Sequence, residues 1–414
     1  MRAVSSPSAH VLLLENIHRS AYAAFEDAGV EVHARATGLN EEALINALAS
    51  IPGDAPLMVG IRSKTHVTER VLDAVPRLHA IGAFCIGTDQ ISLSGARDRG
   101  VVVFNAPFSN TRSVAELMIG EIIMLARHVF MRSAACHRGE WRKSAKGSHE
   151  VRGKTLGIVG YGHIGSQLSV LAEALGMHVI FYDIVNKLPL GNARACGSLD
   201  ELLAASDFVS LHVPDTSLTR GMMGAAELAK MRRGASLLNA SRGLVVDVDA
   251  LRAALDEGRL SGAAIDVYPK EPKGEGQSFE SVLRGCERAI LTPHIGGSTE
   301  EAQANIGREV SIALAGYLRA GVTVGAKNLP QVDAPDWDGG CRISNIHRNV
   351  PGVLSAINNV VSGSGINVAG QHLATMESVG VLIVDLCIPR DDPRARGLRA
   401  AIAELSTSLR TRLL

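Results

Sequence analysis

Three residues with side chains suited to proton transfer and carboxylate binding stand at or just beyond the ends of predicted strands. They are Arg242, Glu271 and His294. In an open parallel sheet, ligands bind outside the carboxyl ends of the strands. We therefore expect these three side chains to reach one crevice.

The three residue types together suit hydride transfer at a 2-hydroxy acid. Histidine titrates near neutral pH and can accept the hydroxyl proton, while a neighbouring carboxylate orients the ring and raises its pKa. A guanidinium can hold the substrate carboxylate and polarise the carbonyl in the reverse direction. Each residue alone has a plainer interpretation: a structural histidine, a surface Glu-Pro turn, or a loop cation. The set on one chain favours catalysis.

A glycine loop, Gly160-Tyr-Gly-His-Ile-Gly165, lies between a predicted strand and a predicted helix. Gly160 permits a tight turn, Gly162 lets the backbone approach a pyrophosphate, and Gly165 lets helix and strand pack closely. The helix N-terminus adds a partial positive charge. The alternative is a glycine-rich turn without a ligand, but the strand–loop–helix context favours a dinucleotide.

Asp183 ends the next predicted strand, 18 residues after Gly165. A carboxylate there can bind both ribose hydroxyls of the adenosine and repels a 2′-phosphate. The sequence therefore predicts NAD rather than NADP.

A second group of polar residues lies on loops, and its charge suits a phosphorylated acid. Arg62, Ser63 and Lys64 follow a predicted strand, and Asn110 and Arg112 precede a long predicted helix. Arginine binds phosphate in a bidentate manner, and lysine adds a point charge. From composition alone, a solvated basic loop is the favoured alternative.

The elements that must position these groups form two α/β runs and a different third segment. The first run predicts strands at 10–14, 57–61, 78–83 and 101–104, followed by a helix from about Ser113 to Arg127 with a capping-box spacing to Glu116. In the second run, strands are predicted to end at Gly160, Asp183, Val213, Ala240, Val267 and Thr292.

The stretch 331–340 is rich in Asp, Gly and Pro and indicates a linker. After it the predicted order is βαββα with a possible last strand at 408–414, and a helix at 351–361 has Pro351 in its first turn. A split βαβ unit of this size suits a regulatory or interaction module.

Composition narrows the class of protein. The 414 residues suit two or three domains, and the 42 Lys and Arg balance 42 Asp and Glu, which gives no basic field for nucleic acid. No stretch approaches a membrane span, and the polar start at 1–7 lacks a signal peptide core. Six scattered cysteines suit reduced thiols. We expect a cytoplasmic protein with no membrane or nucleic-acid partner and no metal site.

The sequence resembles the D-isomer-specific 2-hydroxyacid dehydrogenases, and within them the bacterial branch that acts on 3-phosphoglycerate. The resemblance covers nearly the whole chain. The matching stretches are 60–66, 81–88, 103–116, 156–165, 239–243, 264–267 and 291–299.

The resemblance implies roles for the residues named above. Arg242 would bind substrate, Glu271 would be the partner of the histidine, and His294 would donate and accept the proton. Arg62 and Ser63 would lie where the family binds substrate. The implied cofactor contacts are Gly160, Gly162, His163, Ile164, Gly165, Asp183, Ala240, Ser241, Arg242, Asp266, His294, Gly296 and Gly297.

The resemblance also implies the domain plan and the reaction. A Rossmann-type doubly wound cofactor domain, 109–296, would be inserted in a flavodoxin-like α/β substrate domain, 1–108 with 297–330. The expected reaction is NAD-dependent oxidation of 3-phospho-D-glycerate to 3-phosphohydroxypyruvate, the first step of L-serine biosynthesis, with reduction of 2-oxoglutarate as a side activity. The alternatives are a glyoxylate or hydroxypyruvate reductase of the same family, and a non-catalytic NAD sensor.

The segment 341–414 resembles an ACT domain, a βαββαβ regulatory fold. The positions that match a serine-binding turn are His347, Asn349 and Asn367, whereas Asn345, Arg348 and Val350 depart from the pattern. The resemblance implies an L-serine effector and a homotetramer assembled through the ACT and cofactor domains. A module used only for assembly is the alternative.

Overall fold

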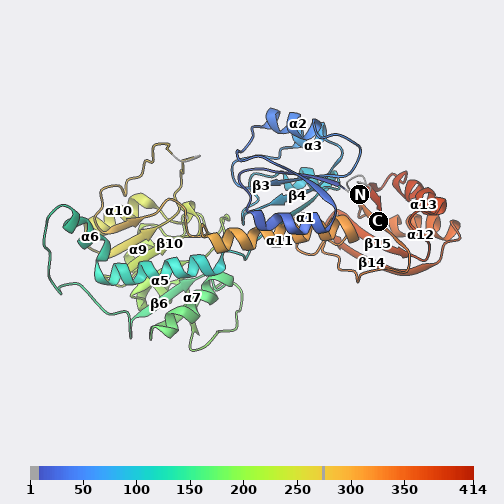
Figure 1. The fold of residues 1–414 in the computed structure, drawn as a ribbon. Coiled ribbons are helices and arrows are strands. Elements are labelled where there is room, and N and C mark those ends of the chain that lie inside the picture. Colours follow the sequence, from blue (N-terminus) through green and yellow to red (C-terminus); the bar gives the residue numbers. More distant parts are fainter. Residues whose placement is uncertain (1–8, 273–275) are drawn as a thin grey trace. The chain divides into compact units, whose positions relative to one another are not determined.

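A computed structural model describes residues 9–272 and 276–414, and the chain divides into two compact units (Figure 1). One unit comprises residues 1–109 and 303–414, and the other comprises 110–302. The polar start at residues 1–7 lies outside the described residues.

The first unit contains a five-stranded parallel sheet in the order β2-β1-β3-β4-β5. Alternate residues of β1 enter two cores: Val11 and Leu13 face α1 and α11, whereas Leu12 faces α2, α3 and α4. The elements are β1 (Ala9–Leu13), α1 (Tyr22–Asp27), β2 (Val30–Ala34), α2 (Glu41–Ala49), β3 (Leu57–Ile61), α3 (Glu69–Ala74), β4 (Leu78–Ala83), α4 (Leu93–Asp98), β5 (Val102–Asn105) and α11 (Glu300–Ala320).

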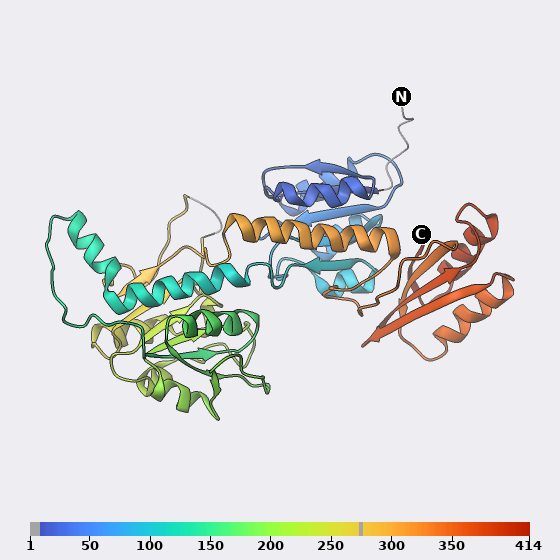
Figure 2. The same ribbon diagram turned by 60° about the horizontal axis from the view of Figure 1, so that its bottom comes forward.

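The C-terminal segment of this unit forms an antiparallel sheet in the order β14-β15-β13-β16, which is the predicted βαββαβ pattern. Helices α12 and α13 pack on one face (Figure 2). Pro351 lies before α12, so its predicted place in the first helical turn is wrong; Gly352 is the N-cap. The bounds are β13 (Cys341–Arg348), α12 (Val353–Gly363), β14 (Val368–Met376), β15 (Val379–Leu386), α13 (Pro393–Ala403) and β16 (Ser408–Leu413).

The other face of this sheet shares a core with the parallel sheet. Val381 and Ile383 belong to the same apolar cluster as Val11 and Leu314. Residues 341–414 therefore pack as part of the first unit rather than as a separate body.

Two arginines of the C-terminal sheet bind the end of α11. Arg342 forms a buried ion pair with Asp385 at 2.6 Å and also donates to the Ala320 carbonyl at 3.2 Å. Arg412 donates to the Tyr317 and Leu318 carbonyls at 3.0 and 2.5 Å. The last carbonyls of a helix lack intrahelical partners and carry partial negative charge, so these guanidinium groups cap α11.

The second unit is a seven-stranded parallel sheet in the order β12-β11-β10-β9-β6-β7-β8. The chain leaves β6 toward β7 and returns on the other side at β9, which makes a topological switch point at their carboxyl ends. The elements are α5 (Thr111–Arg127), α6 (Val129–His137), β6 (Thr155–Val159), α7 (His163–Ala174), β7 (His178–Tyr182), β8 (Arg194–Ala195), α8 (Leu199–Ala205), β9 (Phe208–Leu211), α9 (Ala225–Lys230), β10 (Ser236–Asn239), α10 (Val248–Asp256), β11 (Gly262–Ile265) and β12 (Ala289–Leu291).

The start of α5 differs from the prediction. The helix begins at Thr111 with Asn110 as N-cap, so Ser113 is inside the helix and forms no capping box. The Ser113 hydroxyl instead lies 2.8 Å from the Thr299 hydroxyl, and Glu116 pairs with Arg112. Ser113 and Glu116 therefore interact with Thr299 and Arg112 instead of capping the helix.

The cysteines are all free thiols. Cys136, in the second unit, and Cys387, in the first, are exposed. Burial raises the pKa of Cys85 to about 11 and raises the pKa of Cys341. Among residues 9–272 and 276–414, no helix is long and apolar enough to cross a membrane.

Candidate active site

The glycine loop after β6 is fixed by close backbone approaches at two of its three glycines. Gly160 has φ +90°, and a Cβ there would lie 2.3 Å from the His212 carbonyl oxygen. A Cβ on Gly165 would lie 2.2 Å from the Gly160 carbonyl oxygen. Real Cβ atoms do not approach this closely, so the fold itself requires glycine at both positions.

Gly162 has no such packing reason. Its φ is −82°, which any residue adopts, and a Cβ there would meet nothing within 4 Å. It is the N-cap of α7, and no side-chain hydrogen bond caps that helix. Open space above an uncapped helix N-terminus fits a diphosphate that needs close backbone approach. His163 and Ile164, which we predicted as cofactor contacts, open α7 beside this space.

Asp183 follows β7 and is held against the same loop. Its Oδ2 accepts a hydrogen bond from the Tyr161 N–H at 2.8 Å, and its Oδ1 accepts from the Val185 N–H at 2.9 Å. The carboxylate therefore lies at the carboxyl end of the sheet next to the phosphate loop, where the ribose of a dinucleotide would bind. Ala240 and Ser241 follow β10 at the same edge.

Asp266 organises the turn that carries the histidine. It is 1% exposed, and its carboxylate accepts from the N–H groups of Ile295 and Gly296, both at 2.8 Å, and from the Thr292 hydroxyl at 2.7 Å. Its backbone carbonyl also accepts from the His294 N–H. We predicted Asp266 as a cofactor contact; in the structure its carboxylate binds the backbone of the turn that carries His294.

His294 and Glu271 are in direct contact. The Nδ1 of His294 lies 2.8 Å from Oε2 of Glu271, whose Oε1 accepts from the Tyr268 N–H at 3.0 Å. His294 has φ +56°, in the left-handed region that non-glycine residues rarely adopt. A carboxylate can only accept, so Nδ1 carries the proton and the neutral ring keeps its lone pair on Nε2.

The pair shifts both titrations in the direction that stabilises the ionised state. The hydrogen bond to Glu271 raises the pKa of His294, although burial opposes the shift. Burial alone would raise the pKa of Glu271, but the hydrogen bonds from His294 and the Tyr268 N–H lower it. The imidazole is thus poised as a base with a raised pKa.

Arg242 belongs to the same group of residues. Its guanidinium donates to the Ser241 carbonyl at 2.8 Å, and the Asn239 side chain donates to the backbone carbonyl of Arg242 at 3.0 Å. Its charge lowers the pKa of both His294 and Glu271. The structure therefore brings together the arginine, glutamate and histidine that we predicted from strand ends.

The residues predicted for the substrate phosphate are divided between the two units. Arg62, Ser63 and Lys64 follow β3 in the first unit, and Ser63 and Lys64 are exposed. Glu15 is a further residue of this site, and its buried carboxylate accepts from the Lys64 and Thr65 N–H groups at 2.9 and 2.8 Å. Glu15 fixes the shape of this loop, and no local pattern indicates it because it lies 49 residues before Lys64.

In the second unit, Asn110 and Arg112 already have neighbours. Asn110 is 7% exposed and lies against Gly297, where a Cβ would be 2.2 Å from its Nδ2. Its Oδ1 is buried without a hydrogen-bond partner. Arg112 pairs with Glu116 on the surface of α5. Their contact with a phosphate stays a prediction.

Glu121 is a buried carboxyl group that the sequence analysis did not single out. It lies inside α5 with no exposed surface and no partner for either oxygen, and it interacts with Asp266. Burial, reinforced by the charge of Asp266, raises the pKa of Glu121 to about 8. The position of Glu121 in the sequence of α5 indicates only that it lies on the buried face of the helix.

Two of the three predicted effector residues line one cavity of about 290 Å³ at the start of α12. His347 is fully buried, its Nε2 has no partner, and Asn349 lies at the same cavity. Asn367 does not line it; its amide contacts Cys387 instead. The structure brings the first two together and leaves the third apart.

Known proteins are similar to this chain in sequence and in fold. Residues 119–296 match the NAD-binding domain of the D-isomer-specific 2-hydroxyacid dehydrogenases. D-3-phosphoglycerate dehydrogenases from Haemophilus influenzae and Escherichia coli K12 are 48% and 50% identical over 97% of this chain and 96% and 97% of their own lengths. The crystal structure of D-lactate dehydrogenase from Aquifex aeolicus, complexed with NAD and lactic acid, is 27% identical, with a TM-score of 0.63 over 74% of this chain and 95% of that one.

The chain belongs to the D-isomer-specific 2-hydroxyacid dehydrogenase family. Within that family it is similar, over nearly its whole length, to the D-3-phosphoglycerate dehydrogenases. The match to the family's NAD-binding domain confirms the predicted cofactor and fold class. The roles of the individual residues remain proposals.

Proposed function

We propose that this protein oxidises 3-phospho-D-glycerate to 3-phosphohydroxypyruvate with NAD. The observation that carries the chemistry is the 2.8 Å contact between His294 and Glu271, at the edge of the sheet that also carries the open glycine loop. The choice of substrate is supported by the similarity to the two D-3-phosphoglycerate dehydrogenases.

Each residue of the site has one task in the proposed reaction. NAD supplies the acceptor for the hydride that leaves C2 of the substrate. His294 accepts the C2 hydroxyl proton at Nε2, because Nδ1 is hydrogen-bonded to Glu271. Glu271 stabilises the imidazolium that forms. Arg242 holds the substrate carboxylate beside the histidine.

Residues that stand apart from the proton transfer would set the substrate's phosphate specificity. Arg62 and Lys64 offer the first unit's cations on a loop held by Glu15, and Asn110 would donate to the phosphate through its Nδ2. A small unphosphorylated acid needs no such cluster. This argues against a glyoxylate or hydroxypyruvate reductase.

The test is an assay of NADH oxidation with 3-phosphohydroxypyruvate, hydroxypyruvate, glyoxylate and 2-oxoglutarate in parallel. The phosphorylated acid should be turned over with the highest kcat/KM. Arg62→Ala should raise KM for the phosphorylated acid and leave the others nearly unchanged. Equal loss for all four substrates would refute the phosphate role of Arg62, and binding of NADH without any oxidation would favour an NAD sensor.

Regulation by L-serine is a further part of the proposal. The cavity beside His347 and Asn349 can take a small amino acid, and the unpartnered Nε2 of His347 offers it a hydrogen-bonding atom. Repeating the assay with L-serine tests this, with Asn349→Ala as the variant. Full activity at saturating L-serine would indicate that residues 341–414 serve only in oligomer assembly.

The proposal also includes a homotetramer, which light scattering tests, and a cytoplasmic location, which the six free thiols support.

A further inference from the structure

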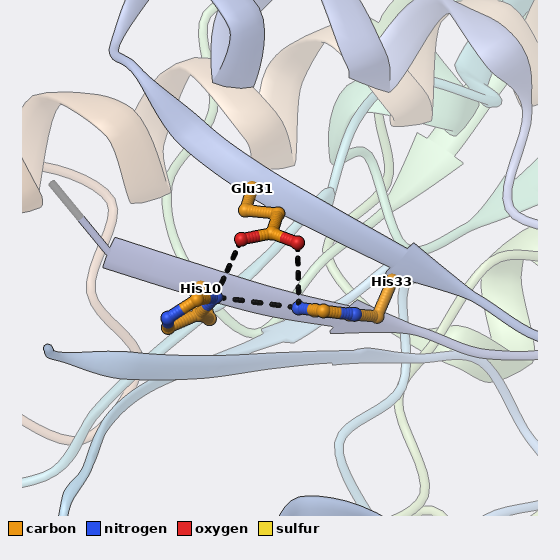
Figure 3. Close-up of side chains that lie close together, drawn as sticks. All are labelled: His10, Glu31 and His33. Atoms are coloured by element: carbon orange, nitrogen blue, oxygen red, sulfur yellow. Dashed lines mark hydrogen bonds and ion pairs between the residues drawn. The ribbon is translucent and has the colours of Figure 1, made fainter. Parts of the chain in front are cut away.

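A cluster of three possible metal ligands lies on the parallel sheet of the first unit, and the proposed reaction uses none of them. His10 is on β1, and Glu31 and His33 are on the edge strand β2 (Figure 3). The strands pair in parallel with His10 opposite Glu31 and Leu12 opposite His33. Since alternate residues of a strand share one face, the register places all three side chains on the same side of the sheet.

Two of the three distances between donor atoms are close to those of a tetrahedral metal site. The His10 Nδ1 lies 3.3 Å from the His33 Nε2 and 3.4 Å from the Glu31 Oε2, and the His33 Nε2 lies 3.9 Å from the Glu31 Oε1. Two ligands bound tetrahedrally at the usual Zn–N distance are about 3.3 Å apart. One ion can therefore contact the three residues with little movement of their side chains.

The environment makes these groups available as ligands. His10 is 4% exposed, and burial lowers its pKa, with the charges of His33 and Arg77 acting in the same direction and Glu31 opposing it. The lowered pKa favours the neutral ring, which is the form that binds a metal. The Arg77 guanidinium donates to the Ile51 carbonyl at 2.5 Å and also to that of Gly53. Glu31 and His33 keep 51% and 29% of their side chains exposed, which leaves an entry path.

We propose that His10, Glu31 and His33 bind one divalent transition-metal ion, with Zn²⁺ as the best match and water completing the coordination. Two imidazoles and a carboxylate suit zinc in preference to magnesium or calcium, which take oxygen ligands. The ion would tie the edge strand β2 to its neighbour β1. Among the described residues this is the one group of three such ligands.

This proposal departs from the expectation, drawn from the sequence, that the chain has no metal site. Twenty-one residues separate His10 from Glu31, and β2 was not predicted, so no ligand spacing marks the cluster. Only the register of β1 against β2 brings the three together. The alternative is a hydrogen-bond network without a metal. In that network, the protonation and tautomeric states of the His10 and His33 rings account for the short contacts.

The experiment uses the full chain, stripped with a chelator and then dialysed. Exposed thiols also bind zinc, so Cys136→Ser/Cys387→Ser serves as the parent protein. Zn²⁺ binding is measured by titration calorimetry, and Co²⁺ is added as a probe because its visible absorption reports tetrahedral nitrogen and oxygen ligands. The variants are His33→Ala and Glu31→Gln, both at partly exposed positions, with His178→Ala on the surface of the second unit as the matched control.

The parent should bind one equivalent of Zn²⁺, show the tetrahedral Co²⁺ spectrum and gain thermal stability with either ion. His33→Ala should weaken binding by at least tenfold, since even the loss of an outer-shell partner costs about 10- to 100-fold. His178→Ala should bind like the parent. Absence of Zn²⁺ binding by the parent protein would overturn the proposal and leave the metal-free network. Equal Zn²⁺ affinity in the parent and in the folded His33→Ala and Glu31→Gln proteins would do the same.

Discussion

The histidine beside Glu271 carries the sharpest prediction at the scale of a single residue. His294→Ala removes the group placed to accept the substrate proton, so kcat should fall by about a hundredfold or more. Stopped-flow or steady-state NADH formation measures the change. His178→Ala, at the exposed start of β7, is a control that should keep nearly full activity. Near-normal turnover in His294→Ala would remove the residue from the mechanism.

The Glu271–His294 contact also predicts a pH profile. Oxidation needs the neutral imidazole, and Glu271 raises the pKa of His294 above its usual 6.5. The value of kcat/KM for oxidation should therefore rise with pH through a midpoint above 6.5. In Glu271→Gln the charge is lost, and the midpoint should move to lower pH while the maximal rate falls. A midpoint that stays in place would show that another group controls the profile.

The buried Glu121 predicts a pH-dependent stability of the second unit. Its pKa is about 8 in the folded protein and near 4.5 in the unfolded chain, so the folded state binds the extra proton between these values. This contribution therefore weakens folding as pH rises from about 4.5 to 8, by up to about 1.4 kcal/mol per pH unit. Glu121→Gln should gain stability relative to the wild type over that range.

Denaturant unfolding at pH 5, 6.5 and 8 measures the difference, and the exposed Glu116→Gln serves as control. The advantage of Glu121→Gln should grow with pH, whereas Glu116→Gln should stay close to the wild type at each pH. A constant difference between Glu121→Gln and the wild type would mean that the carboxyl group is ionised in the folded protein.

The sequence predicts part of the site because residue type and strand position are local. Arg242, Glu271, His294 and Asp183 follow strands whose apolar runs are easily read, and parallel strands end at one edge. Glu15 escapes prediction because its role depends on a contact across 49 residues. The left-handed backbone of His294 is also fixed by the surrounding fold rather than by its neighbours in sequence.

At the scale of an element, the glycine loop separates folding from cofactor binding. Gly162→Ala adds a methyl group to open space, so the protein should fold with unchanged stability but bind NAD at least tenfold more weakly, because the methyl group occupies the pyrophosphate's approach. Gly165→Ala would place its Cβ against the Gly160 carbonyl oxygen, so its main effect should be a loss of thermal stability rather than of NAD affinity. NADH fluorescence titration and thermal unfolding distinguish the two effects.

Unchanged NADH affinity in a folded Gly162→Ala protein would contradict the placement of the phosphates. The comparison of the two glycines is informative because both belong to one motif of the sequence. The pattern alone assigns each a task, but only the structure shows which task belongs to the fold and which to the ligand.

Strands with continuous apolar runs were predictable, and two others were not. Strand β2 alternates Val, Glu, Val and His at the sheet edge, and β8 has only two residues, both exposed. Neither buries enough apolar surface to produce a strong pattern. The predicted capping box at Ser113 failed because local spacing does not reveal which tertiary partner takes a side chain. Pro351 is not helical because α12 begins after Gly352, its N-cap.

At the scale of the whole molecule, Arg342 predicts how firmly the C-terminal sheet is held to α11, because its guanidinium pairs with Asp385 inside the sheet and also binds the Ala320 carbonyl. Arg342→Met leaves the buried Asp385 with only His372, at 3.7 Å, beside its carboxylate and removes a cap from α11, which should cost about 3–5 kcal/mol. The exposed pair at Arg394→Met should cost less than about 1 kcal/mol. Equilibrium unfolding measures both.

Arg342→Met/Asp385→Leu removes the stranded charge and should recover part of the loss, although the contact to the Ala320 carbonyl stays absent. A single variant as stable as the wild type would show that the pair is not buried in solution. The apolar core that the parallel sheet shares with the C-terminal sheet also holds that sheet in place. Deleting residues 341–414 would expose the side of the first unit's core near Leu314.

The distribution of the free thiols offers a ready means of following motion. Cys136 and Cys387 are exposed and lie one in each unit, whereas burial raises the pKa values of Cys85 and Cys341 and so slows their reaction as thiolates. In Cys196→Ser/Cys286→Ser, which removes the two partly exposed thiols of the second unit, maleimide labelling at limiting reagent should therefore give a donor–acceptor dye pair across the two units. Energy transfer between those dyes would record any domain closure caused by NAD or substrate, one molecule at a time.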